Sequence, residues 1–239
     1  MMKGMKKIKA KTFHVITLFP EVLEPYFRAS ILGRAGERGL LKFDLVDLRQ
    51  FGNGRHKKVD DRPFGGGAGM VLMSEPILRA FDSVKKKGDS KRTKVVVFSA
   101  KGKDFNQKMA YDWSKRYDDI VIIAGRYEGI DERVRKALKA EEVSIGHYVL
   151  TDGDVAAMVV ASAVGRLVPG AINFESLKEE SHWNLLLKKE KNVPASDGLE
   201  YPHYTRPETL VYKKKKYRVP KVLLSGDHAA IRRWRGKAL

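Results

Sequence analysis

The chain has 239 residues, 43% of them hydrophobic, with no cysteine and a formal net charge of +18 from 47 Lys and Arg against 29 Asp and Glu. This length can bury one large or two small cores, and the lack of cysteine excludes disulfides, cysteine-bound zinc and a thiol nucleophile. The positive charge favours nucleic acid as a partner, ahead of an anionic membrane surface.

The same composition indicates where the protein works. No apolar run in the sequence is long enough to span a bilayer, and the lysine-rich residues 1–11 lack the apolar core of a signal peptide. A chain without cysteine fits a reducing compartment. We therefore predict a cytoplasmic protein with no membrane partner.

Strands and helices are predicted to alternate from residue 13 to about residue 169. The segments 13–19 and 43–48 are predicted as strands, and two helices between them begin at Pro20 and at Ser30, with Ser30 as N-cap. Further strands are predicted at 94–99, 119–124 and 142–145, and further helices at 74–86, 105–113, 130–138 and 154–164. This alternation is typical of an α/β domain with a largely parallel sheet, which we assign to residues 1–172.

Two more segments follow this domain. Residues 173–200 are polar and lysine-rich and predict a flexible linker, with one helical turn around residues 183–189. Residues 201–239 predict a small, mainly helical C-terminal domain, in which Asp227 caps a terminal helix that carries several arginines.

Glycine turns follow three of the predicted strands, at residues 99–102, at Gly125 and at Gly146. Turns at the same end of neighbouring parallel strands form the crevice in which open α/β sheets bind ligands. Ordinary strand-to-helix turns are the simpler interpretation, but these turns also concentrate Tyr and carboxylates. The predicted helix 154–164 is apolar on nearly all sides, so we expect it to be buried.

A fourth glycine segment, residues 65–69, follows Asp60, Asp61 and Arg62. It matches neither the P-loop nor the dinucleotide-binding pattern, so we expect a loop whose backbone approaches a ligand closely. The histidines show no zinc-binding spacing, and no Gly-x-Ser-x-Gly motif is present. What remains is a crevice without a phosphate cradle, a basic surface and a few carboxylates that could take a proton, and this combination suggests group transfer onto RNA.

Five segments, in order along the chain, resemble the bacterial tRNA (guanine-N1)-methyltransferases, the TrmD family. They are Asp60-Asp-Arg-Pro-Phe-Gly-Gly-Gly-Ala-Gly-Met70, Gly125-Arg-Tyr-Glu-Gly-Ile-Asp-Glu-Arg133, Ser144-Ile-Gly-His-Tyr-Val-Leu150, Pro202-His-Tyr-Thr-Arg-Pro207 and Val222-Leu-Leu-Ser-Gly-Asp-His-Ala-Ala-Ile-Arg-Arg-Trp-Arg235. The resemblance implies a SPOUT-type α/β fold with a C-terminal trefoil knot and a homodimer with active sites at the subunit interface. It also implies methyl transfer from S-adenosylmethionine to N1 of the guanosine 3′-adjacent to the anticodon of tRNA.

The resemblance further implies roles for individual residues. The cofactor-binding residues would be Ser99, Ala100, Gly102, Gly125, Tyr127, Glu128, Ser144, Ile145, Gly146, His147, Tyr148, Val149, Leu150 and Gly153. The residues that contact tRNA would be His56, Asp60, Gly67, Gly69, Arg206 and Arg232, with the glycine loop reaching the pocket of the partner subunit. The catalytic residues would be Arg166 and Glu180, with Glu179 as the rival position for the carboxylate. Mg²⁺ dependence is possible by family, but the sequence shows no ligand set for it.

These roles agree with the chemistry of the reaction. N1 of guanine carries a proton and is a poor nucleophile until that proton leaves, so a carboxylate would act as general base. An arginine near O6 would stabilise the negative charge that develops there. Two alternatives stay open: a protein that binds tRNA and cofactor with weak or lost turnover, and a knotted methyltransferase for another RNA position.

Overall fold

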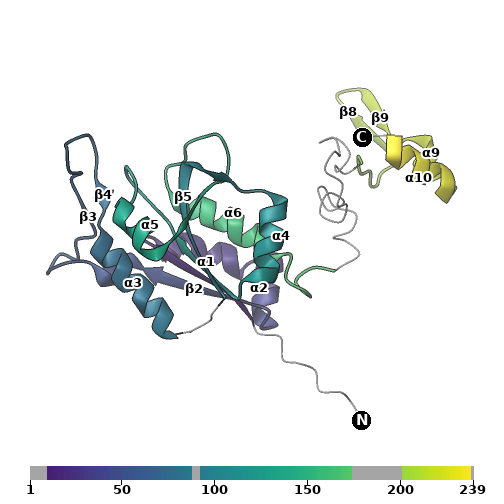
Figure 1. Ribbon diagram of the computed structural model, residues 1–239. Coiled ribbons are helices and arrows are strands. Elements are labelled where there is room, and N and C mark those ends of the chain that lie inside the picture. Colours follow the sequence, from purple (N-terminus) through teal and green to yellow (C-terminus); the bar gives the residue numbers. More distant parts are fainter. Residues whose placement is uncertain (1–9, 88–91, 174–200, 238–239) are drawn as a thin grey trace, which may run out of the picture. The chain divides into compact units, whose positions relative to one another are not determined.

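The computed structural model describes residues 10–87, 92–173 and 201–237. The chain divides into two units, Met1–Phe174 and Glu175–Leu239, which we describe one at a time (Figure 1). The predicted linker, residues 173–200, lies outside the described residues except for Asn173.

A five-stranded sheet forms the centre of the first unit, and every neighbouring pair of its strands is parallel. Its strand order is β2 (Leu41–Asp47), β1 (Lys11–Thr17), β6 (Asp119–Ile123), β5 (Thr93–Asp104) and β7 (Glu141–Ser144). The predicted α/β class with a largely parallel sheet is therefore confirmed. All residues of β6 are buried, as expected for an inner strand with both faces covered.

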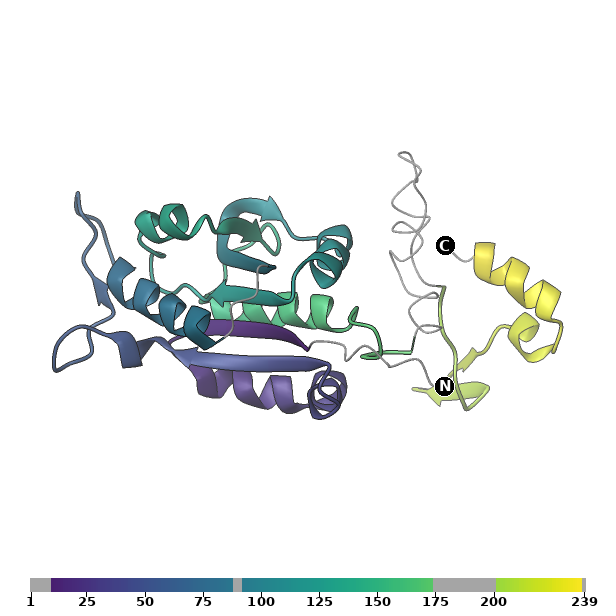
Figure 2. The same ribbon diagram turned by 60° about the horizontal axis from the view of Figure 1, so that its bottom comes forward.

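Helices cover both faces of this sheet. They are α1 (Pro20–Arg28), α2 (Ser30–Glu37), α3 (Ser74–Lys87), α4 (Gln107–Arg116), α5 (Glu132–Leu138) and α6 (Gly153–Gly165), with a 3-10 turn η1 (Leu48–Phe51). Helices α1 and α2 pack against β2, and α6 packs against β1, α1 and α4; Figure 2 shows α1 and α2, in purple, along β2. Helix α3 packs against β1, η1 and α5.

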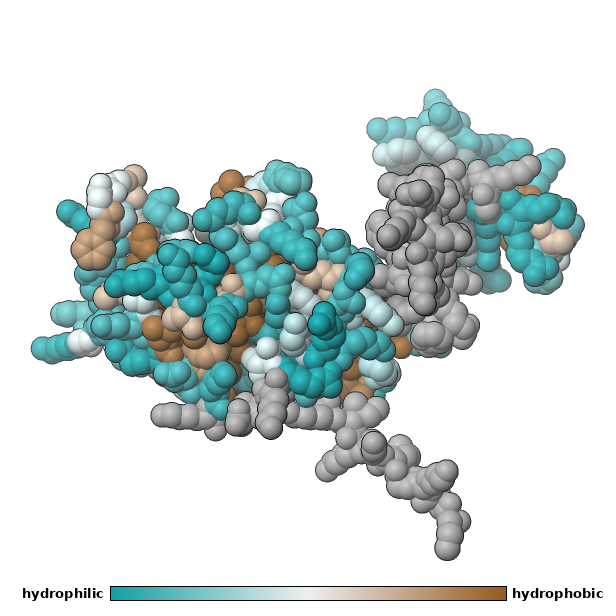
Figure 3. All heavy atoms as spheres, viewed as in Figure 1, coloured by the Kyte–Doolittle hydropathy of each residue, from teal (hydrophilic) through white to brown (hydrophobic). Residues whose placement is uncertain are grey.

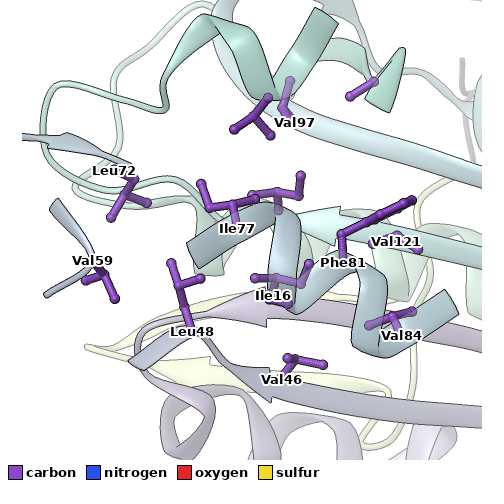
Figure 4. Close-up of a cluster of buried hydrophobic side chains, with 14 of the residues drawn as sticks. Ile16, Val46, Leu48, Val59, Leu72, Ile77, Phe81, Val84, Val97 and Val121 are labelled. Carbon is purple, nitrogen blue, oxygen red and sulfur yellow. The ribbon is translucent and has the colours of Figure 1, made fainter. Parts of the chain in front are cut away.

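One hydrophobic core lies between the sheet and helix α3 (Figure 4). Ile16, Val46 and Val121 reach it from three adjacent strands, and Ile77 and Phe81 reach it from α3. Ile77 and Phe81 are four residues apart and so lie on one face of the helix. This packing fixes the carboxyl ends of the strands relative to one another.

The predicted turn at residues 99–102 is a bulge inside a longer strand. Strand β5 runs on to Asp104, and both Phe98 and Lys103 pair with Val143 of β7. A Cβ on Gly102 would lie 2.6 Å from the backbone N of Val143, so this glycine allows two backbones to touch. The next helix begins at Gln107, capped by Asn106, and not at residue 105 as predicted.

The predicted N-cap role of Ser30 is wrong. Ala29 is the N-cap of α2 and makes no side-chain capping bond, while Ser30 is the first helical residue, with a φ of 50°. The prediction for Asp227 is correct, because its carboxylate accepts hydrogen bonds from the N–H groups of Ala229 and Ala230.

Helix α6 is not buried on all sides, contrary to the prediction. Val155 and Val159, one turn apart, are 41% and 42% exposed, and on the neighbouring helix α1 Val22 and Tyr26 are 50% and 42% exposed. We call these four residues the α1–α6 stripe. One apolar face of this helix is therefore open to solvent in the described chain.

A projecting arm connects η1 to α3. It contains the short antiparallel strands β3 (Asp60–Asp61) and β4 (Val71–Leu72). Gly65, Gly66, Gly67 and Gly69 have positive φ angles between these strands, a conformation that favours glycine. Phe64, in the same loop, is fully exposed.

The second unit contains a β-hairpin that the sequence analysis missed. Strands β8 (Thr209–Tyr212) and β9 (Lys215–Arg218) pair in antiparallel, and helices α9 (Lys221–Leu224) and α10 (His228–Lys237) follow. The ring of Tyr204 lies 6.2 Å from that of Trp234, and the guanidinium of Arg235 lies 4.4 Å from the ring centre of Tyr201. In the described parts of both units, no helix has the length and apolarity needed to cross a bilayer.

Candidate functional site

A cavity of about 390 Å³ opens at the carboxyl ends of the adjacent strands β6, β5 and β7. Its volume lies in the range of roughly 300–1,000 Å³ that is common for small-molecule sites. The bulge of β5 and the loops after β6 and β7 form its walls. The predicted cofactor-binding residues that line it are Ser99, Ala100, Gly125, Tyr127, Glu128, Ser144, Ile145, Gly146, Tyr148, Val149, Leu150 and Gly153.

A backbone hydrogen bond between Gly125 and Gly153 joins the turn after β6 to the end of the loop after β7. The N–H of Gly153 donates to the carbonyl of Gly125 over 2.8 Å. A Cβ on Gly153 would lie 2.8 Å from the backbone N of Gly125, so the start of α6 can approach the β6 turn only because residue 153 has no side chain. These two glycines therefore set the width of one end of the cavity.

The turn after β7 is held by its own side chains. The hydroxyl of Ser144, which is buried, donates to the carbonyl of Gly146 over 3.0 Å. The phenol of Tyr148 donates to the carbonyl of Ile145 over 3.2 Å. The backbone of this turn is therefore fixed at the cavity wall before a ligand arrives.

A buried polar cluster, which the sequence analysis missed, joins the β6 turn to the start of α6. The Arg126 guanidinium lies 3.4 Å from Asp152 and 3.3 Å from Asp154, and it stacks 4.1 Å from the centre of the Phe19 ring. The Thr17 hydroxyl donates to Asp154 over 2.5 Å. Burial raises the pKa of Asp154, while the hydrogen bonds from Thr17 and Arg126 act in the opposite direction.

Asp154→Asn should weaken cofactor binding and destabilise the first unit. The change removes one of the two carboxylates that hold Arg126, and Arg126 belongs to the turn that lines the cavity. We expect a loss of about 1–3 kcal/mol in the free energy of unfolding, the usual cost of leaving a buried hydrogen-bonding group unpaired. Thermal unfolding and calorimetric titration with the cofactor measure the two effects. Wild-type values for both would show that the cluster does not hold the turn.

The base of the arm contacts the β6 turn of the same chain. The N–H of Glu128 donates to the carbonyl of Met70 over 3.1 Å, and a Cβ on Gly69 would collide with the Glu128 side chain. Tyr127 has a positive φ of 58°, and its phenol hydrogen-bonds to Asp60. Desolvation is the larger cause that raises the pKa of Tyr127, and this hydrogen bond is the second. A non-glycine residue in this conformation is strained, and such strain concentrates at functional sites.

Several predicted residues do not meet at this cavity. Gly102 and His147 do not line it; the imidazole of His147 lies 3.7 Å from the carboxylate of Asp104. His56 and Gly67 are exposed in the arm itself, and Gly67 belongs to the loop between β3 and β4. Arg206 and Arg232 are exposed in the second unit, and both candidate bases, Glu179 and Glu180, lie outside the described residues.

Arg166 also lies far from the cavity of its own chain. It is the C-cap of α6, whereas the cavity touches the first turn of that helix, at Gly153 and Ala156. The helix has 13 residues, so its two ends are separated by about 20 Å.

The residues around the cavity fit S-adenosylmethionine. Tyr127 and Tyr148 supply ring surfaces, and Glu128 is one of several carboxylates near which the positive charge of the cofactor would be stabilised. The Nε of Arg126 is buried and has no hydrogen-bond partner among the described residues. In the described parts of the chain, no three His, Cys, Asp or Glu residues gather closely enough to form a metal-binding cluster.

The fold and the site together define an α/β protein that binds a small ligand at the carboxyl ends of parallel strands. Comparison with known proteins identifies it further. The family described as tRNA (Guanine-1)-methyltransferase TrmD matches residues 11–239. The chain therefore belongs to this family of tRNA-modifying methyltransferases.

Individual relatives agree with this membership. A protein of Borreliella burgdorferi is 46% identical over 224 residues, which cover 93% of this chain and 85% of the relative. A protein of Pelotomaculum thermopropionicum is 47% identical, over 92% of this chain and 82% of the relative, and one of Clostridioides difficile is 42% identical, over 93% and 90%. All three are named tRNA (guanine-N(1)-)-methyltransferase.

Proposed function

We propose that this chain transfers a methyl group from S-adenosylmethionine to N1 of the guanosine 3′-adjacent to the anticodon in tRNA. Membership of the family implies this cofactor. The observation that carries the proposal is the convergence of the three glycine-containing segments, at Ser99, Gly125 and Ile145, on one cavity at the carboxyl ends of β5, β6 and β7. That convergence provides a single place for a methyl donor.

The cofactor supplies an electrophilic methyl group that needs alignment and no further activation. The N1–C bond forms as the S–C bond breaks, and the bonding electrons stay on sulfur. The proton of N1 passes to a carboxylate, which we assign to Glu180, with Glu179 as the alternative. The guanidinium of Arg166 stabilises the charge that develops on O6 of the base.

The geometry of α6 supports a site completed by a second copy of the chain. Arg166 lies about 15 Å along the helix axis from Ala156, the lining residue nearest to it on α6, which is beyond the reach of its side chain. It follows Val155 by eleven residues, about three helical turns, and therefore lies on the helix face that carries the α1–α6 stripe. A twofold axis across that stripe would bring the C-terminal end of each α6 to the N-terminal end of the other.

The exposed apolar residues of the first unit support the same proposal. The α1–α6 stripe and the fully exposed Phe64 of the arm are the kind of surface that a subunit interface covers. In the dimer, the glycine loop of the arm would reach the pocket of the partner subunit. Asp60 and Gly69 lie at the base of the arm, against Tyr127 and Glu128 of their own chain, so we place them at the pocket of that chain. The arm's base meanwhile stays against the β6 turn of its own chain.

The charge of the second unit supports tRNA as the substrate. Residues 201–237 contain eleven Lys and Arg against two carboxylates, Glu208 and Asp227. Such an excess attracts phosphate groups. In Figure 3, hydrophilic residues cover most of the visible surface of this unit. We retain the trefoil knot and the cytoplasmic location as further proposals from the family resemblance and the composition.

Incubation of the protein with S-adenosylmethionine labelled in the methyl group and with a tRNA transcript tests the proposed function. The expected product is labelled 1-methylguanosine, located 3′ of the anticodon by sequencing. Label in another nucleoside would assign the chain to another RNA position. Retained binding of tRNA and cofactor without transfer would identify a protein that has lost turnover.

A further inference from the structure

The β8–β9 hairpin of the second unit is exposed on both of its faces. All residues from Thr209 to Arg218 are exposed, including Leu210, Val211 and two tyrosines at 47–59%. A two-stranded hairpin by itself is marginally stable in water. A hairpin that keeps apolar and aromatic side chains in solvent is therefore a surface built for contact with something else.

The register of the hairpin sorts its side chains into two different faces. Leu210 pairs with Tyr217, and Tyr212 pairs with Lys215, so Leu210 and both tyrosines share one face. The opposite face carries Lys216 and Arg218, with Thr209 and Val211. The ammonium groups of Lys213 and Lys215 lie 5.4 and 5.3 Å from the ring centres of Tyr212 and Tyr217.

The tip of the hairpin consists of two lysines in an unusual conformation. Lys213 and Lys214 have φ angles of 47° and 64°. Two-residue hairpin turns with positive φ at both positions strongly prefer Asn-Gly or Asp-Gly, because a side chain at these angles is strained. Lysines at both positions therefore put charge at the tip at the expense of local stability, which points to a role for that charge.

We propose that the β8–β9 hairpin is a tRNA-binding ribbon, in which Tyr212 and Tyr217 stack on unpaired bases while Lys213 and Lys214 contact phosphates. This inference rests on the proposed function, since it concerns the substrate of the same reaction. Stacked aromatic rings with adjacent cations form the usual platform for unpaired nucleotides. An anionic membrane would attract the same lysines, but the match to a family of tRNA-modifying enzymes favours RNA as the partner.

The tip can be tested by a variant that removes its charge and improves its turn. Lys213→Asn with Lys214→Gly installs the residues that this turn prefers, so the hairpin stays folded. We expect the full-length variant to bind a tRNA transcript about tenfold more weakly, or weaker still, in 0.1 M salt. The slope of log K against log salt should fall in magnitude by about 1.4–1.8, the value for two lost phosphate contacts.

A matched control removes the same charge elsewhere. Lys108→Gln with Lys115→Gln changes two exposed lysines on α4 of the first unit, to a residue that is equally compatible with a helix. This variant should keep nearly wild-type tRNA affinity. Equal losses in the two double variants would mean that tRNA responds only to overall charge, and would overturn the proposal.

The aromatic face has its own test. Tyr217→Phe keeps the stacking ring and should retain wild-type affinity, whereas Tyr217→Ala should lose about fivefold or more, as expected for one lost base stack. Equal affinity of the Ala and Phe variants would contradict stacking. Vesicles of phosphatidylserine and phosphatidylcholine provide the membrane comparison: if the tip variant lost vesicle binding but kept tRNA binding, the hairpin would be a membrane contact and the proposal would be wrong.

The two proposals can fail separately. If the wild-type chain produces 1-methylguanosine and the hairpin variants bind tRNA as the wild type does, only the hairpin inference fails. If the wild type binds tRNA but produces no 1-methylguanosine, the proposed function fails, and weakened binding by the hairpin variants would still support the ribbon.

Discussion

Glu180→Gln is expected to lower the rate of methyl transfer at least about 100-fold, the lower end of what a positioned general base contributes. The glutamine keeps the shape of the side chain but cannot take the proton of N1. Cofactor affinity should stay within about twofold of wild type, because residue 180 is separate in sequence from every segment that lines the cavity. Single-turnover transfer and cofactor titration measure the two quantities.

Glu179→Gln is the matched control, since it removes the same charge from the adjacent position. It should retain most of the activity. Loss of transfer in Glu179→Gln with retention in Glu180→Gln would move the base by one residue. Retention in both variants would mean that neither carboxylate accepts the proton.

Val155→Asp with Val159→Asp is expected to yield a monomer without methyltransferase activity. Both side chains lie in the middle of the stripe that we assign to the subunit interface, and burying two unpaired carboxylates there would cost several kcal/mol each. In the monomer they remain in water, so the fold should survive. Sedimentation measures the mass, and circular dichroism checks the fold.

A control for this variant is Val211→Asp, which places a carboxylate on another exposed valine, in the second unit. Its sedimentation should match that of the wild type. If the variant with Val155→Asp and Val159→Asp sediments as the wild type does, the α1–α6 stripe is not part of the subunit interface. A wild-type chain that is itself monomeric would remove the interface altogether.

The sequence was sufficient to predict the features that arise from local patterns. The strand at residues 119–124 is predicted because the side chains after Asp119 are continuously apolar, and the structure buries every residue of β6, Asp119–Ile123. The turns at Gly125 and Gly146 were predicted from glycines at strand ends, and the cavity lies there. Asp227 was predicted as a cap because its side chain bonds to the backbone a few residues away.

Features that depend on distant contacts could not be predicted in this way. Thr17 and Asp154 are 137 positions apart, and only the folded chain shows that they meet at Arg126. Gly102 was predicted to border a cofactor, but its lack of a side chain serves the contact with β7. The position of Gly102 in the sequence does not indicate that β7 lies beside it in the fold.

The hairpin was missed for a different reason. Its turn is made by Lys213 and Lys214, whereas glycine or asparagine at these positions is the usual signal for such a turn. In addition, Thr209–Tyr212 shows only a weak strand-like alternation. The same lysines, which give no turn signal in the sequence, are the residues that we propose to contact tRNA.

Methyl transfer by a mixed dimer tests the central claim most directly. One chain carries Arg166→Ala, and the other carries Ala100→Trp, which fills the cavity with a large side chain. Each variant should be inactive as a homodimer. If Arg166 serves the cavity of the partner subunit, the heterodimer purified through two different tags has one intact site and should show about half of the wild-type activity. A heterodimer as inactive as both homodimers would mean that each chain builds its site alone, and would contradict the account.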